Sequence, residues 1–337
     1  MIGHAGIRRR LREAVERDGL HHALMFEGPR GVGKRLLADE LARLANCTAP
    51  VDRRPCPPGR DRCPTCVAIA NGVHPDVIVL EPDRDKAART IPIEAIRETI
   101  RQAQYHRYGA RARFVIVDPA EAMLEPAANA LLKTLEEPPV GTHFVLITHN
   151  PRALLPTIRS RCQRIRFGAV AATEIEAWLA ARDVPADRAA AAARLALGCP
   201  GRAAGLADGG LDTRAELRSE LIRTLDAPLA DVYQFSATVT QGARQDWAEQ
   251  VEAVIELIED LARDASIRAT GASVPALDGD PASAAIVDRL AQTWPHGITA
   301  CARAVQDARD DLEVYVSGKT VVDALITAVR REIPGPA

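Results

Sequence analysis

Segments suited to buried strands alternate with amphipathic helical patterns over the first half of the chain. Five segments are predicted to form strands: 22–27, 74–80, 114–118, 143–148 and 163–167. Helical patterns lie between several of them, at 36–42, 91–105 and 127–137. This alternation predicts a parallel sheet with helices on both faces. In such a sheet, a ligand binds at the carboxyl ends of the strands.

The pattern changes after residue 167, where helical periodicity takes over. Short alanine-rich helices are predicted over 173–207, and the rest of the chain from 211 is mostly helical. The predicted fold class is therefore α/β plus all-α, with a sheet domain at 1–168, a small helical domain at 169–209 and a helical domain at 210–337. A helical bundle of that size often packs on other subunits.

The segment after the first predicted strand has the pattern of a phosphate-binding loop. Gly28, Gly31, Gly33 and Lys34 form a G-x-x-x-x-G-K sequence that opens a predicted helix. Backbone N–H groups and the lysine of such a loop hold phosphates at a helix N-terminus. The next residue is Arg35 instead of a Ser or Thr. Because an arginine side chain has no acceptor atom, the hydroxyl that binds Mg²⁺ is missing.

The third predicted strand ends in an acid that resembles the second nucleotide-binding motif. Asp118 stands where an acid binds Mg²⁺ in nucleoside triphosphatases, although it could instead cap the following turn. The next residue, Pro119, replaces the usual glutamate that activates water, and Glu121 is poorly placed to substitute for it. We therefore expect no intrinsic ATPase activity. The loop and its lysine leave binding of ATP or ADP without turnover open.

Four cysteines lie close together between the phosphate loop and the second predicted strand. They are Cys47, Cys56, Cys63 and Cys66, and the stretch between them at 48–62 is rich in proline. Such a segment forms neither a helix nor a central strand, so another interaction has to order it. Four thiolates around a structural Zn²⁺ would do so, in an insertion spanning 47–66. The alternative is two unrelated pairs of reduced cysteines.

Composition and charge exclude several classes of protein. The formal net charge is −2, so bulk charge does not draw the chain to nucleic acid. A basic cluster at Arg8–Arg12 could contact DNA or nucleotide, or could be a solvated helix face. No apolar run reaches the roughly 20 residues of a membrane span, and the N-terminus lacks a signal-peptide pattern. We expect a cytoplasmic protein with no membrane partner.

Three features together resemble the delta-prime family of bacterial DNA polymerase III clamp-loader subunits, within the AAA+ proteins. They are the segment NALLKTLEEPP at 129–139, the motif Ser160-Arg161-Cys162 and the four-cysteine insertion. The resemblance implies an AAA+ sheet domain, a helical lid and a C-terminal collar that joins a pentameric ring. It also implies that Arg161 is an arginine finger for a neighbouring subunit and that Arg202 is a nucleotide-sensing lid arginine. The spacing from Cys56 to Cys63 is longer than in the family.

The resemblance implies a function in DNA replication. The chain would be the stator of the clamp loader, with tau/gamma motor subunits and delta as partners, and would help load the sliding clamp onto primer-template DNA. It would not hydrolyse ATP itself but would act on a neighbour's ATP through Arg161, unless that residue only forms a surface salt bridge. The alternatives are a self-sufficient tau/gamma-like ATPase, favoured by Lys34 and Asp118, and a zinc-bearing nucleic-acid-binding module.

Overall fold

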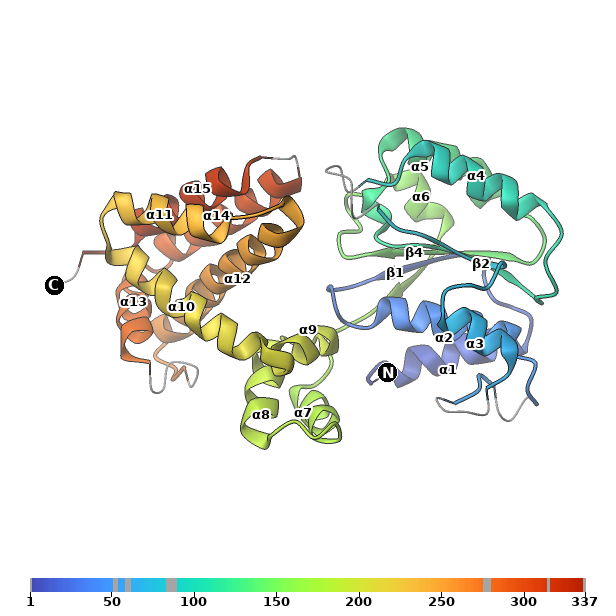
Figure 1. Ribbon diagram of the computed structural model, residues 1–337, viewed down its shortest axis with the longest axis horizontal. Helices are drawn as coiled ribbons and strands as arrows, with labels where there is room; N and C mark the ends of the chain where they lie inside the picture. The colour runs from blue at the N-terminus through green and yellow to red at the C-terminus, as the bar shows by residue number, and fades with distance from the viewer. Residues whose placement is uncertain are drawn as a thin grey trace. The chain divides into compact units, whose positions relative to one another are not determined.

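The chain divides into two compact units, Met1–Asp208 and Gly209–Ala337 (Figure 1). The structure is a computed structural model, and it describes residues 2–50, 54–57, 62–82, 90–274, 280–313 and 316–335. Parts of the predicted 47–66 insertion, at 51–53 and 58–61, lie outside the described residues.

A five-stranded parallel sheet forms the centre of the first unit. Its strands are β1 (Ala23–Glu27), β2 (Val77–Leu80), β3 (Arg113–Val117), β4 (Thr142–Thr148) and β5 (Gln163–Arg166). The strand order is β2-β3-β4-β1-β5, and every neighbouring pair is parallel. The five predicted strands are confirmed, with small differences at their ends. The order places β1 and β3, the strands that precede the two predicted nucleotide motifs, on either side of β4.

Helices cover both faces of this sheet (Figure 1). One face carries α1 (Ala5–Glu16), α2 (Lys34–Asn46) and α3 (Pro64–Ala70), and the other carries α4 (Ile93–Gln104), α5 (Glu125–Glu136) and α6 (Pro156–Arg161). Successive side chains of β1 point to opposite faces of the sheet, as the strand period of two requires. Leu24 and Phe26 join the core beneath α1 and α2, whereas Met25 joins the core beneath α5. The α/β part of the predicted fold class is confirmed.

Three short helices follow the sheet within the first unit. They are α7 (Ala172–Ala180), α8 (Ala186–Leu195) and α9 (Pro200–Gly205), followed by a π-helical turn at Leu206–Gly210. The start of α9 contacts the phosphate loop, because Gly201 N–H donates to the carbonyl of Gly31 at 2.8 Å. The separation of these helices from the sheet at residue 168, as a lid domain, stays a prediction.

Every secondary-structure element described in the second unit is a helix. Its helices are α10 (Leu211–Asp226), α11 (Leu229–Val239), α12 (Arg244–Ala269), α13 (Pro281–Ala291), α14 (His296–Glu313) and α15 (Gly318–Glu332). One face of α12 is buried against the others, and Val251, Val254 and Ile255 are fully inaccessible to solvent. This spacing follows the helical period, so one stripe of α12 forms the centre of the unit's core. Among the described residues, no helix combines the length and the apolar character needed to cross a membrane.

Candidate nucleotide pocket and cysteine cluster

The phosphate loop lies where the sequence predicts it, between the end of β1 and the start of α2. Gly28, Gly31 and Gly33 all have positive φ, of 151°, 74° and 105°. Close packing also restricts two of these positions. A Cβ at Gly28 would lie 2.4 Å from the carbonyl oxygen of Phe167, and one at Gly31 would lie 3.2 Å from the amide nitrogen of Arg202. Larger residues would therefore displace the loop from β5 and from α9.

Lys34 points back into this loop. Its Nζ donates to the carbonyl oxygens of Gly28 at 2.5 Å and Pro29 at 2.7 Å. The side chain is almost fully buried, and this burial lowers the pKa of Lys34 despite the nearby carboxylates of Asp118 and Glu121. The ammonium thus lies inside the predicted phosphate site, held by contacts that a phosphate oxygen can replace.

Arg35 lies among three carboxylates at the carboxyl edge of the sheet. Its Nε donates to Asp39 at 3.2 Å, and its Nη1 pairs with Glu81 and lies 3.7 Å from Asp118. The strand pattern of the sequence predicts Asp118 at this edge, but it gives no prediction for Asp39 or Glu81. A signal for Glu81 existed, because it follows β2 directly as Asp118 follows β3. Leu80 and Val117, the residues before these two acids, are register partners.

The residues present do not fit a Mg²⁺ site. Mg²⁺ requires a close shell of oxygen ligands. Here the hydroxyl is absent, and the permanently charged guanidinium of Arg35 contacts the carboxylate that the sequence assigned to the metal. A cation close to three carboxylates already balances part of their charge, and it repels a second cation.

Glu121 is not available as a base for hydrolysis. Its carboxylate accepts hydrogen bonds from the backbone N–H of His149, at 3.0 Å, and pairs with that residue's ring. Burial alone would raise the pKa of Glu121, but the hydrogen bonds and charge of His149 outweigh burial and hold the pKa at about 2. A carboxylate with so low a pKa is a weak base at neutral pH.

Arg161 is the last residue of α6. Its Nη1 donates to the carbonyl of Thr157 at 2.9 Å, and its Nη2 pairs with Glu136, the last residue of α5. The exposed fraction is 34% for the arginine side chain and 48% for the glutamate. Exposed pairs of this kind contribute only ~0–1 kcal/mol. Arg161 therefore forms the surface salt bridge considered above, yet its guanidinium is only weakly held there.

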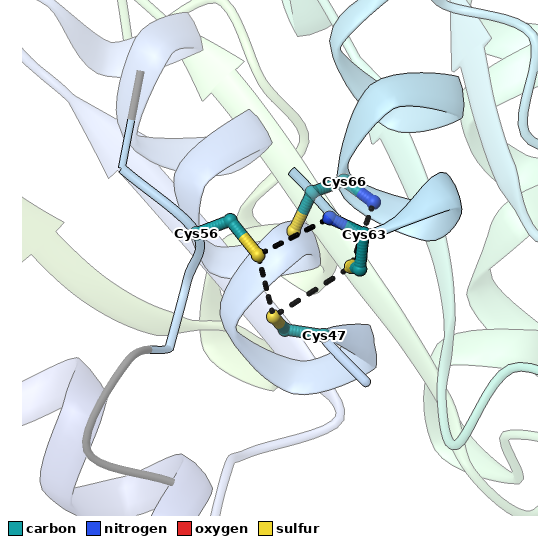
Figure 2. Close-up of side chains that lie close together, drawn as sticks. All are labelled: Cys47, Cys56, Cys63 and Cys66. Atoms are coloured by element: carbon teal, nitrogen blue, oxygen red, sulfur yellow. Dashed lines mark hydrogen bonds between the residues drawn. The ribbon is translucent and has the colours of Figure 1, made fainter. Parts of the chain in front are cut away.

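The four predicted zinc ligands form one cluster (Figure 2). Cys47 ends α2, Cys63 begins α3, Cys66 lies in its first turn, and Cys56 comes from the loop between the two helices. All four sulfur atoms lie within 4.8 Å of one another. The Sγ of Cys47 is 3.6 Å from that of Cys56 and 3.8 Å from that of Cys63. They are thus one group and not two unrelated pairs.

The geometry and donor set of this cluster fit a tetrahedral zinc ion. With Zn–S distances of about 2.3 Å, a regular tetrahedron places its sulfur atoms about 3.8 Å apart. The two Sγ–Sγ distances from Cys47 to Cys56 and to Cys63 agree with that value. Burial raises the pKa of Cys66. Burial also raises that of Cys63, but hydrogen bonds from Thr48 and from the backbone of Cys66 outweigh it and lower the pKa to about 6. Zn²⁺ would be held by four protein ligands, which leaves no position open for catalysis.

Comparison with known proteins gives a consistent family. The sequence model described as "DNA polymerase III, delta subunit" matches residues 3–171. DNA polymerase III subunit delta' of Pseudomonas aeruginosa is 41% identical over 172 residues, which cover 49% of each chain. The protein of the same name from Escherichia coli is 34% identical over 257 residues, covering 75% of this chain and 72% of that one.

The match to the Pseudomonas protein therefore spans about half of that relative's length. A solved structure of a DNA polymerase III gamma subunit-related protein from Thermotoga maritima is 18% identical, with a TM-score of 0.43 over 96% of this chain and 99% of that one. The family assignment depends on the sequence matches alone. With the family model covering half of the chain and the E. coli relative covering three quarters of it, this chain belongs to the DNA polymerase III delta-prime family.

Proposed function

We propose that this chain is the stator of the DNA polymerase III clamp loader, a subunit that does not hydrolyse ATP. In this role it helps the complex load the sliding clamp onto primed DNA during replication. Its partners are the tau/gamma motor subunits and delta, and it contacts the clamp and the primer-template DNA through the complex. Similarity to proteins named delta' supports this proposal.

One observation is the main support for the proposal that this chain does not hydrolyse ATP: Arg35 lies where a hydrolysing site needs a metal ligand. Its contacts with Asp39, Glu81 and Asp118 bring a fixed positive charge to that position. Pro119 can neither orient nor deprotonate a water molecule, and Glu121 is held by His149. The pocket therefore lacks both the metal ligand and the base that hydrolysis requires.

The second part of the proposal is that Arg161 acts on the nucleotide of a neighbouring motor subunit. A guanidinium is planar and always charged, which suits contact with a γ-phosphate. An arginine finger supplied by another chain can raise the rate by roughly 10³–10⁵. A weak pair with Glu136 keeps the Arg161 side chain at the surface and costs little to break.

Arg161→Ala in the reconstituted complex tests this role. The complex should still assemble. The rate of ATP hydrolysis at the one neighbouring site should fall by roughly 10³–10⁵. The DNA-stimulated ATPase rate of the whole complex should therefore fall by the amount that this one site contributes. Arg152→Ala is a matched control, because Arg152 is an exposed arginine in the segment between β4 and α6. Glu136→Gln breaks the salt bridge but keeps the finger. An unchanged ATPase in Arg161→Ala, or an equal loss in Glu136→Gln, would refute the assignment.

The competing function is a self-sufficient ATPase, which the positions of Lys34 and Asp118 favour. Purified chain alone distinguishes the two. Turnover of ATP that disappears in Lys34→Ala would support the motor function and contradict the stator proposal. We expect no turnover above the level of that variant.

A further inference from the structure

The contacts of Arg35 indicate that this residue has a binding role of its own, in addition to replacing a metal ligand. Its three carboxylate neighbours come from two separate parts of the fold. Asp39 lies one turn further along α2, while Glu81 and Asp118 follow two adjacent strands whose last residues are register partners. The fold therefore assembles a group of acids at the carboxyl edge of the sheet, and one guanidinium contacts all three.

This group has the character of a cation site. Burial raises the pKa of both Asp39 and Asp118, and the nearby charge of Glu81 raises it further. Arg35 opposes that rise in both cases. Three carboxylates at the edge of a phosphate loop are the environment in which a divalent cation normally bridges protein and phosphate. The guanidinium supplies the positive charge in its place.

The glycine loop keeps the backbone features of a phosphate site. The glycine loop keeps its positive φ angles, and α2 is 13 residues long, with its N-terminus at the loop. Lys34 is only 6% exposed. Among the described residues, the only groups that accept hydrogen bonds from its ammonium are carbonyls of the loop. Among the described residues, none accepts a hydrogen bond from Nη2 of Arg35, so that nitrogen can donate to a phosphate oxygen.

We propose that Arg35 takes the place of the divalent cation, so that this pocket binds the di- or triphosphate of a nucleotide without Mg²⁺. Lys34 and the loop N–H groups bind the phosphates, and Arg35 links them to Asp39, Glu81 and Asp118. Charge-assisted bonds from a guanidinium to phosphate are strong enough for this role. The inference goes beyond the proposed function, because it concerns this chain's own pocket and holds whether or not Arg161 reaches a neighbour.

Binding of fluorescent N-methylanthraniloyl derivatives of ADP and ATP to the full chain tests the inference. Each titration is carried out in buffer freed of magnesium by dialysis and in the same buffer with millimolar Mg²⁺. Strong chelators are avoided, since they would also remove zinc from the cysteine cluster. The dissociation constant of the wild type should agree between the two buffers within about twofold, whereas Mg²⁺ should tighten binding to Arg35→Thr by about tenfold or more.

Further variants make each outcome decisive. Lys34→Ala should lose binding in both buffers, which shows that the probe occupies this pocket. Arg35→Lys keeps the positive charge and should bind equally well with and without Mg²⁺. Arg35→Gln, which removes the charge, replaces Arg35→Thr if that variant does not fold, as judged by circular dichroism.

Tightening of wild-type binding by about tenfold on adding Mg²⁺ would overturn the inference. So would the absence of nucleotide binding in both buffers. Neither result bears on Arg161, whose role is tested by the ATPase of the assembled complex.

Discussion

We propose that the cysteine cluster holds a structural Zn²⁺, so that replacing Cys66 with serine should release the ion and unfold the structure around the cluster. Structural zinc sites have apparent binding free energies of about 10–16 kcal/mol near neutral pH. Shared equally among four thiolates, this is roughly 2.5–4 kcal/mol for each ligand. Loss of one ligand should therefore weaken zinc binding by roughly two to three orders of magnitude. Cys66 is fully buried, and its backbone N–H donates to Cys63 Sγ at 3.4 Å, so a serine cannot move away to avoid the metal.

The structural consequence should be local. The core around the cluster consists of the cysteines and Ala49, whereas the cores on both faces of the sheet are built from other residues. Helix α3 has only seven residues, too few to be stable alone in water, and apart from Cys66 its one buried side chain is Ile69, which joins the core beside the sheet. Without zinc, we expect α3 and the described residues next to Cys47 and Cys56 to lose protection from hydrogen exchange, while β1 and β3 keep theirs.

Two measurements check this prediction. Metal analysis of the purified chain should give one zinc per chain for the wild type, and competition with a colorimetric chelator should give the ratio of affinities. Hydrogen exchange should locate the loss of protection in α3 and in the described residues next to Cys47 and Cys56. Cys301→Ser is the matched control, because Cys301 is equally buried but lies in the second unit. It should keep its zinc.

Two results would refute the reasoning. Wild-type chain prepared under reducing conditions with zinc supplied, yet containing none, would show that the four sulfur atoms do not bind the ion. Equal zinc content in Cys66→Ser and in the wild type, at chelator concentrations that separate the expected affinities, would show that Cys66 is not a ligand.

Two further predictions concern buried charges. Asp76→Asn should lower the free energy of unfolding, measured by urea denaturation, by about 3–5 kcal/mol. Arg113 pairs with Asp76 at 2.8 Å, and the substitution leaves this arginine buried without its charged partner. A change under about 1 kcal/mol would contradict this value. Glu121→Gln should destabilise the chain at neutral pH by roughly 3 kcal/mol, from a pKa of about 2 in the fold against an ordinary value of 4.5. Because the pKa of Glu121 is lowered in the folded state, this stabilisation is present above about pH 5 and is lost as the pH falls towards 2. The difference in unfolding free energy between wild type and variant should therefore shrink over that range. An equal difference at pH 7 and pH 3 would contradict the prediction.

Most of the first unit's strands follow from local pattern. The strand before Gly28 and the strand before Asp118 are short apolar runs bounded by clear signals, so their positions were predictable. The parallel arrangement follows from the helices between strands. The pattern could not give the strand order, which depends on how helices pack on a twisted sheet.

Residue types and spacing along the chain were enough to predict that the four cysteines form one group and that a glycine loop opens α2; the zinc and the phosphate that these features would bind stay predictions. Both are largely local: Cys63 and Cys66 lie on one helical turn, and Gly28 to Lys34 form one continuous loop, so chain connectivity brings their groups together. The surroundings of Arg35 were decided only by the tertiary structure. Its partners Glu81 and Asp118 are 46 and 83 positions away in the sequence. Both acids lie near Arg35 because β2 and β3 are neighbouring parallel strands whose last residues are register partners. Strand pairing brings these distant carboxylates to the loop, and no single segment of the sequence carries that information.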